Sequence, residues 1–285
     1  MRYGTIAIIG RTNVGKSTFL NTALGMPLAI VSSQPQTTRD TLLGVVNLDD
    51  AQIAFVDTPG VHRPKNELGR RMNQEAADSL HNADVALFMT DIYQMGSGSA
   101  KPHEQHARSK GDPAEKGDTD LIAQIPERLP TLLVVNKVDR LHDKTRLLPF
   151  LESLNTLRTF AATIPISARE NDGVERVLAE AAALLPEGAS QYGPDDVTDR
   201  PVSFFAREYV REQVLAMATR EVPHAAAVTL DSIEERSSGL HVAATIHVEK
   251  AGQRSILIGK GGEKIREIGT AARARLGELT GGTVH

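Results

Sequence analysis

Short apolar runs alternate with polar motifs and amphipathic stretches through the first 186 residues of the chain. Apolar runs of about four to eight residues are typical of buried strands, whereas apolar residues that recur every three or four positions are typical of helices. Strands that end in a polar motif and lead into a helix indicate a mostly parallel sheet with helices on both faces. The predicted strands are a run that starts at Thr5, then Leu42–Leu48, Gln52–Asp57, Asp84–Thr90, Leu132–Val135 and Ile164–Ile166, and the predicted helices include Lys16–Leu24 and Val174–Leu185.

A change in composition marks a second domain. Residues 187–202 are rich in Gly, Pro and Asp, which predicts a linker between a first domain at 1–186 and a second at 203–285. The second domain has an α+β pattern, in which a third short strand leads through a glycine loop into the last helix. Its predicted elements are Ser203–Thr219, Ala226–Ile233, Gly239–Val248, Ser255–Ile258, the loop Gly259–Gly262 and Glu263–Leu276.

The segment Tyr93–Asp120 contains few large apolar residues and many Gly, Ser, Lys, Asp and Pro residues. Such a segment buries too little apolar surface to offset its ordering entropy, so we expect a disordered surface insertion. His103 and His106 flank Glu104 within it, a spacing that invites a metal-binding interpretation. Histidines in disordered segments usually have no ligand, and we assign none here.

The residues after the first strand have the pattern of a phosphate-binding loop, G-x-x-x-x-G-K-S. In this pattern backbone N–H groups surround the phosphates, and the next helix points its N-terminus at them. The glycines permit close backbone approach, the lysine brings charge to the β- and γ-phosphates, and the serine hydroxyl can bind Mg²⁺. The predicted nucleotide-binding residues of the loop are Gly10, Asn13, Val14, Gly15, Lys16, Ser17 and Thr18.

Two further motifs predict contacts with Mg²⁺ and the γ-phosphate. Asp57 ends a predicted strand, where its carboxylate can hold Mg²⁺ through water, and the amide of Gly60 can bond the γ-phosphate. Thr37 and Thr38 lie in the polar loop Ser32–Asp40, where a threonine hydroxyl can complete the Mg²⁺ shell while the γ-phosphate is present. We assign this role to Thr38, although threonines that simply enter a strand would give the same pattern. The predicted catalytic groups are Lys16, Thr38 and Gly60, and the predicted Mg²⁺ ligands are Ser17, Thr38 and, through water, Asp57.

Asn136-Lys137-x-Asp139 follows a later strand and predicts recognition of guanine. A carboxylate at Asp139 accepts hydrogen bonds from N1–H and the N2 amine of guanine, donors that adenine lacks, and Asn136 can face the N7 and O6 edge. Ser167 and Ala168 follow the next strand, and their backbone N–H groups are expected to support the base. Any one of these motifs alone also fits an ordinary surface loop, but in this order they predict GTP.

Composition narrows the class of protein further. The 285 residues are 40% hydrophobic and include no cysteine, which excludes disulfides, thiolate metal sites and cysteine nucleophiles. No apolar run reaches the roughly 18 residues that a membrane helix needs, and Met1 leads into a strand without a signal-like segment, so we expect a cytosolic protein. Residues 250–285 contain seven basic and three acidic residues, a surface compatible with nucleic acid.

Taken in order, these motifs resemble those of the translation-factor-related GTPases, and QTTRD at 36–40 with VDTPG at 56–60 resembles the Era branch. The sequences Val210–Val228 and Ile256–Gly269 are similar to the K-homology domain that Era proteins carry after their GTPase domain. The resemblance covers nearly the whole chain apart from the insertion. It implies an α/β P-loop GTPase domain followed by a smaller α+β K-homology domain of type II.

The same resemblance implies ligands and partners. GTP and GDP would bind with Mg²⁺, and the protein would act as a GTP-dependent switch in assembly of the small (30S-type) ribosomal subunit. The K-homology domain would hold the 3′ end of the 16S-type ribosomal RNA. The resemblance also implies a cytoplasmic monomer, with peripheral association at the inner face of the cell membrane as a further family property.

The Gly259-x-x-Gly262 loop is the predicted RNA clamp. Apolar residues on one side would form a groove for bases, and basic residues on the other would meet phosphates, although a glycine turn beside a solvated helix face has a similar appearance. The predicted RNA-binding residues are Ile256, Ile258, Gly259, Lys260, Gly261, Gly262, Lys264 and Arg266.

Three departures from the family pattern affect the prediction. Val61 stands where Ras-type enzymes have a water-orienting glutamine, so turnover is expected to be slow or to use other groups. Asn13 matches an asparagine that related GTPases use to hold K⁺. The alternative interpretation is that Asn13 only shapes the loop. The Tyr93–Asp120 insertion is longer than is usual in the family. The chain stops at Val284-His285, where the family continues into a last strand, which predicts an exposed sheet edge.

Two other functions are compatible with parts of the sequence. A tRNA-modifying partner GTPase would need a catalytic cysteine and a cofactor domain, and this chain has no cysteine. An RNA-binding scaffold that holds guanine nucleotide with little turnover is compatible with Val61 and stays open.

Overall fold

The computed structural model describes residues 1–32, 34, 37–60, 67–91, 116–141, 145, 147–218 and 225–285. The described chain divides into two compact units, one formed by Met1–Ala29 with Thr38–Asp199 and the other by Ile30–Thr37 with Arg200–His285. No helix among these residues is long and apolar enough to cross a membrane.

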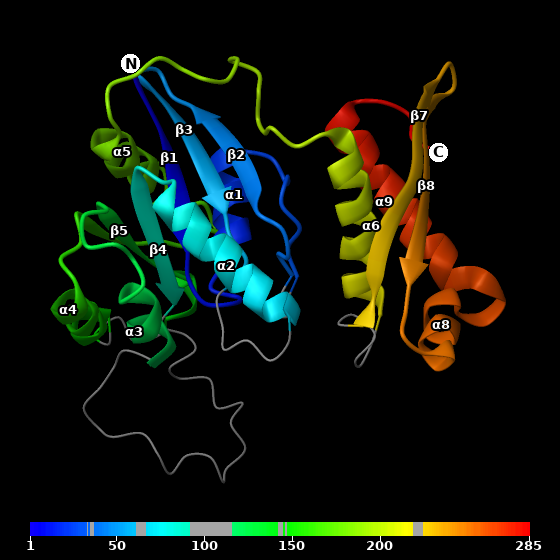
Figure 1. Cartoon of the computed structure of the whole chain (residues 1–285), viewed down its shortest axis with the longest axis horizontal. Coiled ribbons are helices and arrows are strands. Elements are labelled where there is room, and N and C mark those ends of the chain that lie inside the picture. The colour runs from blue at the N-terminus through cyan, green and yellow to red at the C-terminus, as the bar shows by residue number, and fades with distance from the viewer. Residues whose placement is uncertain are drawn as a thin grey trace, which may run out of the picture. The chain divides into compact units, whose positions relative to one another are not determined.

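The first unit contains a six-stranded sheet in the order β2-β3-β1-β4-β5-β6 (Figure 1). β2 and β3 form the predicted antiparallel hairpin, and the other neighbouring strands are parallel, which confirms the expected α/β architecture. Every residue of β4 and β5 is buried, because helices cover both faces. The strands are β1 (Arg2–Ile9), β2 (Leu42–Asn47), β3 (Ala51–Asp57), β4 (Val85–Asp91), β5 (Thr131–Asn136) and β6 (Ala162–Pro165).

Alternate strand residues face two helical layers. Ile9 and Phe88 face a core that includes Leu80 of one helix, Leu121 of a second and Leu154 of a third. On the other face the first helix packs against the fifth, and Phe19 meets Phe55 edge to face with ring centroids 5.6 Å apart. The helices are α1 (Lys16–Leu24), α2 (Glu67–His81), α3 (Lys116–Ile122), α4 (Leu147–Leu157) and α5 (Val174–Leu184).

The first described residues after position 115 form α3, so the predicted insertion ends earlier than Asp120. The prediction was wrong over 116–120 because composition does not indicate tertiary contacts. Asp118 is buried in an ion pair, and Leu121 is part of the core. Residues 93–115, including the histidine pair, lie outside the described residues.

The compositional linker follows the edge of the first sheet. The side chain of Gln52 donates to the Tyr192 carbonyl at 2.9 Å and accepts from the Gln191 and Tyr192 N–H groups. The Val45 N–H donates to the Val197 carbonyl at 2.9 Å. The first part of residues 187–202 is therefore hydrogen-bonded to the first unit.

The second unit packs helices on one face of an antiparallel pair of strands (Figure 1). Val214, Ala226, Leu257 and Ile268 form its core with Ala218. Its elements are α6 (Val202–Met217), β7 (Ala227–Arg236), β8 (Gly239–His247), α8 (Ala251–Ile258) and α9 (Glu263–Thr280).

The run Ser255–Ile258 lies in helix α8, so the prediction of a strand there was wrong. Gln253 caps the start of the helix, where its side-chain oxygen accepts the Lys250 N–H at 3.0 Å. Gln253 and Leu257, four residues apart, are the buried positions, which is a helical period. An apolar run of four residues does not distinguish the two states.

The expected open edge of the second sheet is partly covered. Thr283–His285 run parallel to the start of β8, with hydrogen bonds from Leu240 N to Thr283 O at 2.9 Å, from Val242 N to His285 O at 2.9 Å and from His285 N to Leu240 O at 2.8 Å. These residues cover the edge at Leu240 and Val242.

Candidate nucleotide-binding site and glycine loop

The loop between β1 and α1 depends on two glycines. Gly15, the N-cap residue of α1, has φ +108°, and a Cβ there would lie 2.2 Å from the Asn136 side-chain nitrogen. A Cβ on Gly10 would lie 2.2 Å from the Met89 carbonyl. The first intrahelical hydrogen bond of α1 joins Phe19 N to Gly15 O, so the N–H groups of Lys16, Ser17 and Thr18 precede that ladder. These are the donors that a helix N-terminus offers to an anion.

Lys16, the first residue of α1, is buried, and its side chain folds back against the loop. Its ammonium donates to the carbonyls of Gly10 at 3.1 Å and Arg11 at 3.0 Å. Burial lowers the pKa of Lys16 from 10.5 to about 8, although the charge of Asp57 acts in the opposite direction. A phosphate group would supply the counter-charge that this buried ammonium favours.

Ser17, Thr38 and Asp57 come together from three separate segments. Ser17 Oγ donates to Asp57 Oδ2 at 2.6 Å and lies 3.0 Å from Thr38 Oγ1, which lies 3.5 Å from the same carboxylate oxygen. Thr37 bonds the Gln34 carbonyl instead. The structure therefore brings Thr38, rather than its neighbour, into the predicted metal site.

The donor set fits Mg²⁺. Two hydroxyls and a carboxylate are the hard oxygen ligands that this ion takes. Asp57 is fully buried, and its Oδ1 has no hydrogen-bond partner among the described residues. Burial raises the pKa of Asp57, against the charge of Lys16 and the hydrogen bonds from Ser17 and Thr38. A bound cation would give this orphaned oxygen a partner and stabilise the charged carboxylate.

Gly60 lies directly against the phosphate loop. A Cβ there would be 2.7 Å from Thr12 Cγ2, 2.8 Å from its Cα and 2.9 Å from its N. The segment after Asp57 is thus in backbone contact with the loop. Val61, at the position of the water-orienting glutamine, lies outside the described residues.

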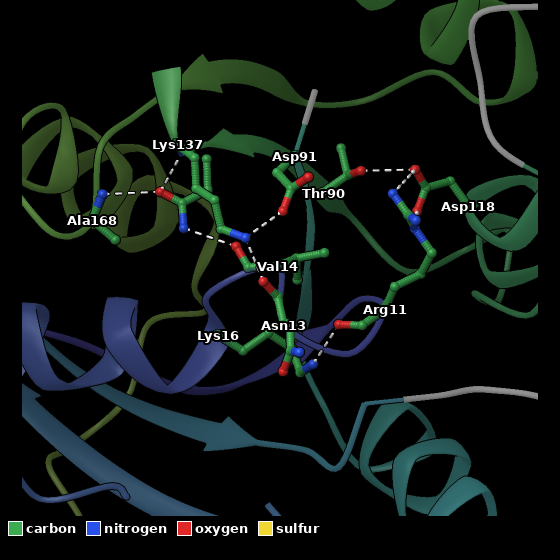
Figure 2. Close-up of polar contacts among 10 residues, drawn as sticks. Arg11, Asn13, Val14, Lys16, Thr90, Asp91, Asp118, Lys137 and Ala168 are labelled. Carbon is green, nitrogen blue, oxygen red and sulfur yellow. Dashed lines mark hydrogen bonds and ion pairs between the residues drawn. The ribbon is translucent and has the colours of Figure 1, made fainter. Parts of the chain in front are cut away.

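The Asn136 side chain connects the phosphate loop to the residues that follow β5 and β6. Its partners Val14, Lys137 and Ala168 are labelled in Figure 2. Its amide nitrogen donates to the Val14 carbonyl at 2.9 Å, and its oxygen accepts the N–H groups of Lys137 at 2.8 Å and Ala168 at 2.9 Å. One amide hydrogen is left for a base. The Ala168 N–H, expected to support the base, supports Asn136 in this structure, and the Ser167 N–H donates to the Asp172 carbonyl at 3.0 Å.

Asp139 lies in the short 3₁₀ turn Val138–Arg140 that follows β5. Its Oδ1 accepts the Ser167 hydroxyl at 2.7 Å. Ser167 thus orients the predicted guanine-reading carboxylate through its side chain.

The structure adds three site residues that motif spacing did not indicate: Asp91, Arg11 and Asp118. The Lys137 ammonium donates to Asp91 Oδ2 at 2.6 Å and also bonds the Asn13 carbonyl. On the other side of the loop, Arg11 pairs with Asp118 (Figure 2). The position of Asp91 at the end of a buried strand, level with Asn136 of β5, is the signal that identifies it; nothing in the sequence places Asp118.

The glycine loop of the second unit joins α8 to α9, two helices rather than a strand and a helix. Gly259, Gly261 and Gly262 have φ of +72°, +60° and +78°, left-handed values that favour glycine. Lys260 is exposed beside them. The loop therefore presents backbone and a lysine to solvent.

The predicted RNA-binding residues around this loop differ in their exposure to solvent. Ile258 is 38% exposed, and Lys264 and Arg266 are half-buried and exposed respectively, whereas Ile256 packs against the core. An apolar groove of about 240 Å³ lies between β8 and α9. Its lining includes Val242, Ala244, Ile246, Ile265, Ile268 and Arg273.

Comparisons with known proteins agree with this arrangement. Residues 5–137 match a family model described as 50S ribosome-binding GTPase, and residues 221–285 match a KH domain model. The chain is 38% identical over 283 residues to GTPase Era of Lactobacillus helveticus, covering 99% of this chain and 88% of the relative. It is 40% identical over 285 residues to GTPase Era of Xanthomonas oryzae pv. oryzae, covering 99% and 89%.

Two solved structures share the fold over the whole chain at 33% identity. One is Era in complex with MgGDPNP and nucleotides 1506–1542 of 16S ribosomal RNA, with a TM-score of 0.88 and coverage of 100% of this chain and 91% of that one. The other is a variant of Aquifex aeolicus Era bound to GDP·AlF4⁻, with a TM-score of 0.88 and coverage of 100% and 92%.

Proposed function

Because this chain belongs to the Era family of GTPases, we propose that it is a GTP-hydrolysing switch that binds 16S-type ribosomal RNA near its 3′ end and assists assembly of the small ribosomal subunit. The observation that carries this proposal is the constellation of Lys16, Ser17, Thr38 and Asp57 in one unit, with a left-handed glycine loop in the other. A relative at 33% identity binds MgGDPNP and that region of 16S ribosomal RNA.

The residues present would hold GTP and Mg²⁺ as follows. Lys16 and the N–H groups of residues 13–16 would bind the β- and γ-phosphates, and Asp139 would read guanine. Ser17 and Thr38 would bind Mg²⁺ directly, and Asp57 would do so through water. When bound, Mg²⁺ neutralises charge that develops on the phosphate oxygens during hydrolysis.

The chain's own groups would promote hydrolysis by electrostatic stabilisation. Lys16, the loop amides and the amide of Gly60 would face the γ-phosphate oxygens as water attacks. No described side chain is an evident general base. The proposed rate acceleration therefore comes from stabilising the charge that develops on the phosphate oxygens. Loss of the γ-phosphate would release Thr38 and Gly60, which gives the protein its two states.

A potassium ion is a second proposed cofactor. Asn13 has φ +63° and its carbonyl accepts the Lys137 ammonium, so the residue is held in a fixed, unusual conformation beside the phosphates. We infer that its side chain helps to bind K⁺, which would supply positive charge in place of an arginine finger. Hydrolysis would then be faster in KCl than in NaCl at equal ionic strength.

The RNA-binding part of the proposal rests on the loop between α8 and α9. The backbone of Gly259–Gly262 would clamp RNA, Lys260, Lys264 and Arg266 would meet phosphates, and Ile258 would contact bases beside the apolar groove. Ile256, which packs against the core of the same unit, would support the glycine loop. Crosslinking the protein to RNA in cells and mapping the contacts tests this directly.

The family resemblance also supports a cytoplasmic monomer that contacts the inner face of the membrane peripherally. Cell fractionation, together with the mass of the purified protein in solution, tests both statements.

The nucleotide part is tested with purified protein in Mg²⁺ and K⁺. We expect micromolar or tighter binding of GDP and GTP, and much weaker binding for Lys16→Ala and Asp139→Asn. If the parent protein fails to bind guanine nucleotides, or if both variants bind as the parent does, the proposed site is wrong.

An RNA-binding scaffold that holds nucleotide with little turnover is the second candidate. Val61 favours it, because a valine side chain cannot orient water by hydrogen bonding. The two candidates differ in whether bound RNA accelerates hydrolysis.

A further inference from the structure

A buried ion pair connects the phosphate loop to helix α3, outside the residues predicted to bind nucleotide (Figure 2). Arg11 Nε lies 2.7 Å from Asp118 Oδ1, and Arg11 Nη2 lies 3.3 Å from Asp118 Oδ2. The Asp118 side chain is completely buried, and the Arg11 side chain is 13% exposed. Two parallel contacts of this kind fix the direction as well as the distance of the guanidinium.

Asp118 is itself held in place. Thr90 of β4 donates its hydroxyl to Asp118 Oδ2 at 2.7 Å, and Leu121 and Ile122 of the same helix lie in the core of the sheet. A Cβ on the preceding residue, Gly117, would lie 2.9 Å from Arg11 Cδ. Helix α3 therefore packs closely against the arginine stem while the sheet fixes the carboxylate.

The same arginine is connected to the predicted reaction centre through its backbone. The Arg11 carbonyl accepts the Lys16 ammonium at 3.0 Å, whereas its guanidinium extends toward α3 (Figure 2). One end of Arg11 thus bonds Lys16, the lysine proposed to meet the phosphates, and the other end bonds Asp118. A shift of α3 would therefore move Arg11 and change the position of the Lys16 ammonium.

We propose that Asp118 is a positioning residue for GTP hydrolysis, which acts through Arg11 to hold the phosphate loop in its working shape. This inference rests on the proposed GTPase function. A buried ion pair adds little net stability compared with well-packed apolar residues, since both charges lose their hydration. Its main consequence is geometric, and misplacing a phosphate-binding group by about 1 Å can cost about a hundredfold in rate.

The test compares Asp118→Asn with Asp120→Asn, an exposed position on the same helix. Single-turnover hydrolysis of GTP, GDP dissociation and thermal unfolding are measured for each. We expect Asp118→Asn to hydrolyse bound GTP at least tenfold more slowly than Asp120→Asn, with a smaller change in nucleotide affinity. A rate within twofold of the control would overturn the proposal.

The double variant Arg11→Gln with Asp118→Asn separates positioning from folding. Arg11→Gln alone leaves a buried carboxylate without its cation, so its melting temperature should fall. The double variant carries no buried charge at this place, so the melting temperature should recover while hydrolysis stays at least tenfold slow. Parental hydrolysis in the folded double variant would show that the pair serves folding only.

The parent protein separates the two proposals. If it neither binds nor hydrolyses GTP, the proposed function fails. If it hydrolyses GTP and the Asp118 variants match it, only the positioning role fails.

Discussion

Nucleotide affinity is expected to fall as the pH rises above about 8, because Lys16 loses its proton there in the nucleotide-free protein. Burial lowers the pKa of this lysine to about 8. Phosphate oxygens favour the ammonium and would return its pKa toward the ordinary value of 10.5. Binding therefore takes up almost no proton near pH 7, about half a proton at pH 8 and close to a full proton well above pH 8, so affinity is nearly constant on the acid side and declines on the alkaline side.

The size of the effect follows from these two pKa values. At about pH 8.8, roughly one-seventh of the nucleotide-free protein carries a protonated Lys16, whereas nearly all of the bound form does. The dissociation constant of GDP should then be about sevenfold higher than at pH 7, which corresponds to about 1.2 kcal/mol. Guanine loses its own N1 proton at still higher pH, so the comparison stops there.

Isothermal titration calorimetry measures both the affinity and the proton uptake, if it is repeated in buffers with different ionisation enthalpies. Lys16→Met is the control, and its weaker binding should show no uptake of a proton between pH 7 and 8.8. An unchanged dissociation constant in the parent, or the same pH dependence in Lys16→Met, would refute the assignment of this pKa to the phosphate contact.

Three further changes test separate parts of the site. Gly15→Ala should abolish nucleotide binding in a filter assay, because its Cβ would lie 2.2 Å from a buried amide nitrogen. Gly25→Ala meets nothing within 4 Å, so it should bind normally and lose only about 1 kcal/mol of stability through its φ of +67°. Equal binding by the two variants would contradict the clash. Asp57→Asn should remove the effect of Mg²⁺ on GDP dissociation without lowering the melting temperature, since burial already opposes the negative charge of the Asp57 carboxylate. If the Mg²⁺ effect is retained in this variant, the metal binds elsewhere. Gly262→Ala should weaken binding of a 3′-end ribosomal RNA fragment at least tenfold in fluorescence anisotropy while leaving GDP binding intact, because φ at Gly262 is +78°. Gly252→Ala, which has open space around it, is the control. Equal RNA affinities of the two variants would argue against the clamp.

Local signals explain which parts of the fold could be predicted. Helix α1 begins and ends where expected because Gly15 and Gly25, both with positive φ, mark its two ends within the sequence. The hairpin of β2 and β3 and the buried strand β5 follow from apolar runs bounded by turn residues. Each of these features depends on neighbouring residues alone.

The remaining features depend on contacts between distant residues. Arg11 and Asp118 are 107 positions apart, and Asp118 lies in a stretch whose composition suggested disorder. Helix α8 was predicted as a strand because its short apolar run fits either period, and the choice is made by Leu257 packing against α6 and α9. Asn136 stays a predicted contact of the base, and the structure adds a role that its motif did not indicate: its side chain connects the phosphate loop at Val14 to Ala168 in the loop after β6.

If this one chain couples GTP hydrolysis to RNA binding, single-turnover hydrolysis measured with and without a 3′-end fragment of 16S ribosomal RNA will reveal the coupling. We expect faster hydrolysis at saturating RNA for the parent protein, and no acceleration for Gly262→Ala at the same RNA concentration. An unchanged rate in the parent while RNA is demonstrably bound would contradict the switch and leave a scaffold that holds nucleotide.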